Sequence, residues 1–157
     1  MVEFDLVQEP RGDTLRRLIV AATETCDRFT FERSGMRLSE RAMNVLTDLA
    51  PYLIGCEETT ETPGSSLPWG TVTLCTYRLT AEAGAILGGA ADGLYDWAEP
   101  ELPQDLCFLR GSAAWLLNLA TDRMAMIDVP RAEADALRAR DPGLRLRERP
   151  STSASTG

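Results

Sequence analysis

Histidine and lysine are both absent from the 157-residue chain, and all 16 basic residues are arginine. Without an imidazole, a Ser-His-Asp or Cys-His nucleophile has no general base, and histidine ligands for zinc, haem or iron are missing. Without a lysine amine, Schiff-base chemistry and a Walker phosphate loop are excluded as well. We therefore predict no metal site and no cofactor, and we single out no catalytic residue.

Cysteine is scarce and scattered, at Cys26, Cys56, Cys75 and Cys107, and no Cys-x-x-Cys pair is present. This spacing favours buried, reduced thiols over a zinc knuckle or a redox motif, with a scattered tetrathiolate site as the weaker alternative. The chain shows neither an N-terminal signal segment nor an apolar run of the roughly 20 residues that a bilayer requires. We expect a cytoplasmic protein without membrane contact, where disulfides are unusual.

Acidic residues outnumber basic ones by 24 to 16, which gives a net charge of −8. Direct nucleic-acid binding is therefore not expected, because its affinity comes largely from cations that displace phosphate counterions. The acidity suits a basic protein partner, although it also simply favours solubility. Residues after Pro130 carry a net +2 and those before it −10. The Arg-rich end either folds against the acidic body, contacts an anionic surface or forms a solvated helix.

Helical spacing of apolar residues predicts four helices. The first covers about 14–27, the second begins after a cap at Ser39, the third follows a cap at Thr80, and the last covers 131–140. Alternating apolar residues predict a strand over 71–79 and three short strands between Leu106 and Val129 that form a meander. Brief strands are also suggested over 2–7 and near Phe29.

These elements predict an α+β fold with a mostly antiparallel sheet of about four strands that ends in the three-strand meander, with helices packed on one face. Residues 1–149 would form a single domain, and the Ser/Thr-rich residues 150–157 a disordered tail. The predicted core includes Leu18, Leu46, Leu74, Phe108, Leu117 and Ile127.

Residues 55–70 are rich in Glu, Thr, Ser, Pro and Gly, and we predict a long exposed loop there. Glu57, Glu58 and Glu61 make it the most acidic stretch of the chain. Such a loop is either a solvated linker or a contact surface for a basic partner.

Aromatic residues gather in two short motifs, Trp69-Gly70-Thr71 and Tyr95-Asp96-Trp97, and the second is followed by Pro100, Pro103 and Asp-Leu-Cys-Phe at 105–108. In this order the motifs resemble those of a set of small uncharacterised bacterial proteins, over about residues 28–129. The resemblance implies a shared framework but no activity. Some of those relatives have a His-Glu pair where this chain has Thr121-Asp122.

Two interpretations of the aromatic residues remain open. Trp and Tyr can close the open end of the core while prolines stiffen the crossing chain. Alternatively, Trp69, Tyr95, Asp96 and Trp97 form a rigid binding patch.

The leading functional hypothesis is a non-catalytic, acidic protein-binding module, such as an inhibitor or immunity-type protein that occludes a basic partner through Glu57, Glu58, Glu61 and the Trp97 region. One alternative is a small hydrolase that uses paired carboxylates among Asp92, Asp96, Glu99, Glu101 and Asp105, which requires a concave pocket with a perturbed pKa. A second alternative is a scaffold or oligomer subunit with an exposed apolar sheet face. The sequence alone identifies neither the partner nor the oligomeric state.

Overall fold

The computed structural model describes residues 1–67 and 70–150 and shows an α+β fold built on one large antiparallel sheet. Eight strands follow one another across it in the order β10-β1-β9-β8-β7-β2-β6-β3. In chain order, the strands of this sheet are β1 (Val2–Leu6), β2 (Arg28–Arg33), β3 (Leu53–Thr59), β6 (Val72–Arg78), β7 (Gln104–Arg110), β8 (Ala113–Leu119), β9 (Met124–Val129) and β10 (Leu146–Glu148).

The predicted α+β class is confirmed, but the expectation of about four strands is wrong. The meander is present as β7, β8 and β9, yet the sheet continues beyond it on both sides. On one side β1 and β10 extend it, and on the other β2, β6 and β3. The two strands that sequence patterning missed entirely, β3 and β10, are the two edges of the sheet.

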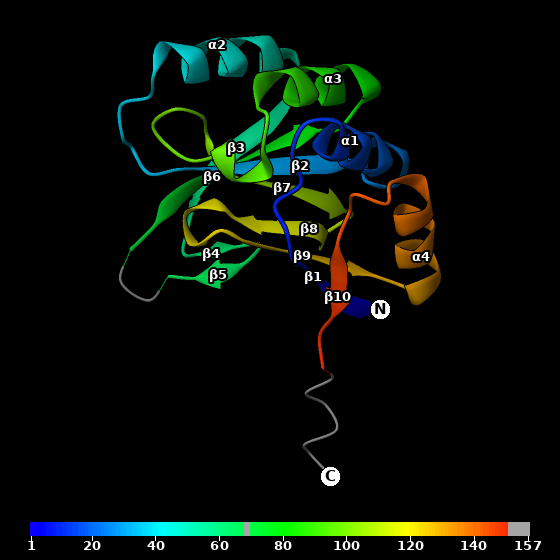
Figure 1. Cartoon of the computed structure of the whole chain (residues 1–157). Coiled ribbons are helices and arrows are strands. Elements are labelled where there is room, and N and C mark those ends of the chain that lie inside the picture. Colours follow the sequence, from blue (N-terminus) through cyan, green and yellow to red (C-terminus); the bar gives the residue numbers. More distant parts are fainter. Residues whose placement is uncertain (68–69, 151–157) are drawn as a thin grey trace.

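Three helices cover one face of the sheet, namely α1 (Asp13–Thr25), α2 (Glu40–Leu49) and α3 (Ala81–Ala90), as Figure 1 shows. The predicted caps are confirmed: the side chains of Ser39 and Thr80 accept hydrogen bonds from the backbone N–H of Ala42 and Ala83, each at 3.1 Å. The fourth helix, α4 (Arg131–Arg140), lies beside α1. Short 3-10 turns, η1 (Ala50–Tyr52), η2 (Leu94–Asp96) and η3 (Ala120–Asp122), complete the helical elements.

The hydrophobic core lies between the helices and the sheet. Leu18, Phe108 and Ile127 are buried there as predicted, together with the aromatic side chains of Phe29 and Phe31. Leu46, Leu74 and Leu117 are only partly buried. Leu117 lies on the other face of the sheet, where the chain between β3 and β6 folds back as the hairpin β4 (Glu61–Thr62) and β5 (Ser65–Ser66).

That hairpin packs closely under the sheet. A Cβ atom added to Gly64 would stand only 2.8 Å from a methyl group of Leu117, so a larger residue at this position would require the Leu117 side chain to shift. Part of the second sheet face is thereby shielded, and Cys107 and Thr30 are buried. Residues 55–70, which we expected to be a loop, are instead largely the edge strand β3 and this hairpin.

The Arg-rich end folds against the acidic body, one of the three outcomes considered from the sequence. β10 pairs with β1, and Arg149 donates to Asp5 at 2.7 Å. Arg140 similarly reaches Glu24 of α1 at 2.5 Å. Residues 151–157, and with them most of the predicted tail, lie outside the described residues. Among the helices of residues 1–67 and 70–150, none is long and apolar enough to cross a membrane.

Candidate functional site

The edge strand β3 is the most exposed regular element of the sheet. The chain leaves α2 through Pro51 in η1 and continues directly into β3, which pairs with β6 on one side only. Six of its seven residues are exposed, and the seventh is half-buried. Leu53 and Ile54, at its start, keep 44% and 48% of their surface in solvent. An exposed strand edge with apolar side chains is a template on which another chain can pair.

The predicted acidic residues lie along this edge. Glu57 stands opposite Leu74 and Glu58 opposite Thr73, so that the two carboxylates point to opposite faces of the sheet. Glu61 follows in β4, where it pairs with Ser66. All three glutamates are exposed. The structure therefore places the three glutamates on one exposed stretch of chain, with Glu57 and Glu58 on opposite faces of β3 and Glu61 in β4.

These glutamates have no counter-ion. No basic residue occurs between Arg41 and Arg78, and within residues 1–67 and 70–150 none of the three takes part in an ion pair. Other acids, such as Glu82, Asp92 and Glu101, likewise form no ion pair in the described residues, so what sets Glu57 and Glu58 apart is their position on an exposed strand edge. The negative charge of the β3 edge is left uncompensated.

A disulfide joins Cys56 of β3 to Cys75 of β6. This corrects the expectation that all four cysteines are reduced and buried, since Cys56 lies on the exposed edge and is bonded. Cys26 and Cys107 are free and buried as expected, and burial raises their thiol pKa values to about 11 and about 12. Such thiols are protonated at neutral pH and therefore poor nucleophiles. The bond ties the edge strand to its neighbour.

The aromatic segment does not form the predicted patch. Trp97 is fully buried, and its ring stacks on Phe31 with the ring centres 5.2 Å apart. This packing corrects the assignment of Trp97 to an exposed site and favours the interpretation in which aromatic residues close the core. Asp96 accepts a hydrogen bond from the backbone of Gly93 at 2.9 Å and so holds its own turn.

The remaining aromatic residues of the predicted site have different outcomes. Tyr95 is half-buried, and Arg123 lies 5.2 Å above its ring centre. Trp69 lies outside the described residues. Tyr95 and Asp96 are therefore far more tied into local structure than the glutamates of the β3 edge.

Sequence reasoning missed a pair of interacting carboxyl groups, Glu32 of β2 and Asp105 of β7. Asp105 is buried with a positive φ of 57°, and its Oδ1 accepts hydrogen bonds from the backbone of Ala120 and the amide of Gln104, both at 2.9 Å. Burial and the nearby Asp105 raise the pKa of Glu32 to about 7. Burial also raises the pKa of Asp105.

The Glu32–Asp105 pair differs in membership from the carboxylate cluster that the sequence predicted. Of the acids between Asp92 and Asp105, Asp105 interacts most strongly with Glu32, and Glu99 also helps raise the pKa of Glu32 while accepting a hydrogen bond from the Ser34 hydroxyl at 2.8 Å. The only sign of the Glu32–Asp105 pair in the sequence was the alternation along the strand near Phe29. This alternation places Thr30 and Glu32 on the same face of the sheet. Groups of three or more metal-ligating side chains are not found in the described ranges.

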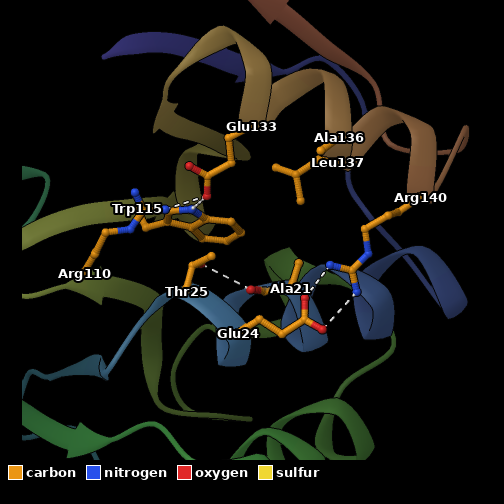
Figure 2. Close-up of a pocket in the computed structure, with 9 residues that line it drawn as sticks. All are labelled: Ala21, Glu24, Thr25, Arg110, Trp115, Glu133, Ala136, Leu137 and Arg140. Carbon is orange, nitrogen blue, oxygen red and sulfur yellow. Dashed lines mark hydrogen bonds and ion pairs between the residues drawn. The ribbon is translucent and has the colours of Figure 1, made fainter.

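A cavity of about 420 Å³ lies between α1 and α4 over the indole of Trp115 (Figure 2). Glu133 accepts hydrogen bonds from Arg110 at 2.5 Å and from the Trp115 indole at 3.0 Å. On the opposite side Arg140 pairs with Glu24. The charged side chains around this cavity thus satisfy one another, and they contrast with the unpaired glutamates of β3.

Comparison of the chain with protein-family models, with curated proteins and with solved structures found no match. The resemblance to small uncharacterised bacterial proteins stays a prediction from the motifs.

Proposed function

We propose that the protein is an acidic, non-catalytic binding module that occludes a basic protein partner, in the manner of an inhibitor or immunity-type protein. The observation that supports it is the charge of Glu57 and Glu58 on an exposed strand edge and of Glu61 in the hairpin that follows, none of which forms an ion pair within the described residues. Unpaired carboxylates on a surface are already solvated and available, so a cationic partner meets them without first breaking an internal ion pair. Complementary charge of this kind raises the rate of encounter and selects against acidic partners.

The hydrolase alternative is less well supported by the same geometry. Glu32 and Asp105 have the raised pKa values that an acid-base pair requires. However, neither side chain lines the cavity between α1 and α4 or the groove between α2 and α3. The hydrolase hypothesis requires a substrate pocket around Glu32 and Asp105, and neither of these two cavities provides one.

The proposal is tested by calorimetric titration of the purified product of the neighbouring gene into the wild-type chain and two triple variants. The first variant carries Glu57→Gln, Glu58→Gln and Glu61→Gln. The matched control carries Asp92→Asn, Glu82→Gln and Glu101→Gln, which removes the same charge from exposed positions elsewhere. With about 0.5 kcal/mol for each exposed charge, the first variant should bind roughly tenfold more weakly at low salt.

The control variant should retain most of the affinity, and the difference between the two variants should shrink at high salt because exposed charges are screened there. Equal losses in both variants would show that only total charge matters. Unchanged affinity in the first variant would show that the β3 edge is not the contact.

We keep the cytoplasm as the proposed compartment. Disulfides are unusual there. A Cys56–Cys75 bond that is already formed in freshly lysed cells would therefore count against the cytoplasm.

A further inference from the structure

The outward side of β3 presents backbone groups that have no partner. The Cα atoms of Cys56 and Cys75 are 4.1 Å apart, which is the spacing of a non-hydrogen-bonded pair in an antiparallel ladder. At such a pair the N–H and C=O of each residue point away from the neighbouring strand. Cys56 and, two residues later, Glu58 therefore direct their backbone groups to the free edge, whereas Glu57 points its own toward β6.

The edge is also open and held in register. In the part of the chain that the structure describes, the outward backbone groups of Cys56 and Glu58 neither donate nor accept a hydrogen bond. Both residues are exposed, so neither the β4–β5 hairpin nor α2 covers them. The disulfide fixes the strand before any partner arrives, which lowers the ordering cost of binding.

We infer that the basic partner binds by adding an extended segment to β3 as a ninth strand of the sheet, and that this segment carries two consecutive basic residues. The inference rests on the proposed function and specifies its partner. Directly opposed residues share a sheet face. Because Glu57 and Glu58 point to opposite faces, neighbouring basic residues on the added strand would meet one glutamate each.

An apolar residue three positions beyond the basic pair would lie opposite Ile54, which is exposed. A second copy of this chain is the poorer occupant. If two β3 strands paired antiparallel through the outward groups of Cys56 and Glu58, Glu57 of one copy would stand opposite Glu57 of the other. Like charges directly opposed destabilise a strand pair, so the charge of the edge disfavours self-association and favours a cationic segment.

The experiment uses two capped nine-residue peptides, TIVRRVTVS and its acidic counterpart TIVEEVTVS, with amide hydrogen exchange followed by NMR. Saturating TIVRRVTVS should slow exchange at the amides of Cys56 and Glu58 by tenfold or more. The amides of Gly55 and Glu57, which already face β6, should change much less. TIVEEVTVS should protect none of these amides.

Two substitutions at one position separate backbone pairing from charge. Glu58→Gln removes one exposed charge and should weaken binding of TIVRRVTVS about twofold. Glu58→Pro also removes the outward N–H while leaving the ladder to β6 intact, and should weaken binding tenfold or more. If this variant does not fold, backbone N-methylation of the peptide tests the same pairing, because it removes an N–H donor from the added strand. The methylated peptide should bind at least tenfold more weakly.

The outcomes distinguish the two proposals. Equal binding to the proline and glutamine variants, without protection at Cys56 and Glu58, would overturn strand addition while leaving the charge-based function standing. Equal binding of the two peptides would overturn the basic-partner function itself. Absence of binding by TIVRRVTVS would overturn the dibasic specification, and a dimer of the free chain that protects the same two amides would identify a second copy as the occupant.

Discussion

The pairing of Glu32 with Asp105 predicts that stability depends on pH through a single side chain. The pKa of Glu32 is about 7 in the folded protein, against an ordinary value of 4.5, chiefly because of burial and then because of Asp105. Between these two values the folded chain keeps a proton that the unfolded chain has released. Stability from this group is therefore complete below about pH 4.5, falls as the pH rises toward 7, and is lost above it.

The magnitude follows from the same two values. A pKa change from 4.5 to about 7 corresponds to about 3 kcal/mol. Glu32 keeps partial contact with solvent, which screens the interaction, so we expect about 1.5 kcal/mol. Glu32→Gln should accordingly stabilise the protein by about this amount at pH 8, because the neutral amide can donate to Asp105 without a charge. At pH 5, where Glu32 is already neutral, the variant and the wild type should be nearly equal.

Urea unfolding of the wild type and the variant at pH 5, 6, 7 and 8 measures this difference. Taking the difference cancels the titrating groups that do not interact with Glu32, because they behave alike in both proteins. Glu101→Gln serves as the control, since it removes one acid from an exposed site and should show no comparable trend. A stability difference that is constant over the range, or a wild type more stable than the variant at pH 8, would refute the reasoning.

Two further predictions concern the core and the disulfide. Trp97→Ala removes a fully buried ring from contact with Phe31 and should cost about 3–5 kcal/mol of unfolding free energy in urea; a cost below about 1 kcal/mol would mean that the side chain is not buried. Cys56→Ala with Cys75→Ala opens a cross-link of sequence separation 19 and should lower stability by about 3 kcal/mol. Denatured wild-type protein should titrate with two free thiols, and a titre of four would contradict the bond.

The helices were predictable because apolar residues recur on one face of each, and α2 and α3 also have a capping side chain at their start. Ser39 and Thr80 both act as the sequence suggested. The same logic failed at β3, since both faces of an edge strand can be exposed and the alternation that reveals a strand then disappears. β10, at the opposite edge, is only three residues long and gave no periodic signal at all.

The candidate site was predictable in its charges but not in its geometry. Glu57, Glu58 and Glu61 were found from composition, which does not depend on fold. Trp97 is buried because its ring stacks on Phe31 of β2, and this contact joins residues far apart in the sequence. The Glu32 and Asp105 pair depends likewise on β2 and β7 being neighbours, a register that local patterns do not encode.

The strand order places the glutamates of β3 far from the paired charges of β10. At the β10 edge, acids and arginines neutralise one another, as in the pairs of Arg149 with Asp5 and of Arg131 with Glu148. β3 lies at the other end of the eight strands, roughly 30 Å away at the usual strand spacing. This exceeds the Debye length of about 8 Å at physiological salt, so the arginines of β10 cannot screen Glu57 and Glu58. If the proposed function holds, a basic partner would be attracted to the β3 edge because of where the charges lie in the sheet, and the net charge alone would not select that edge.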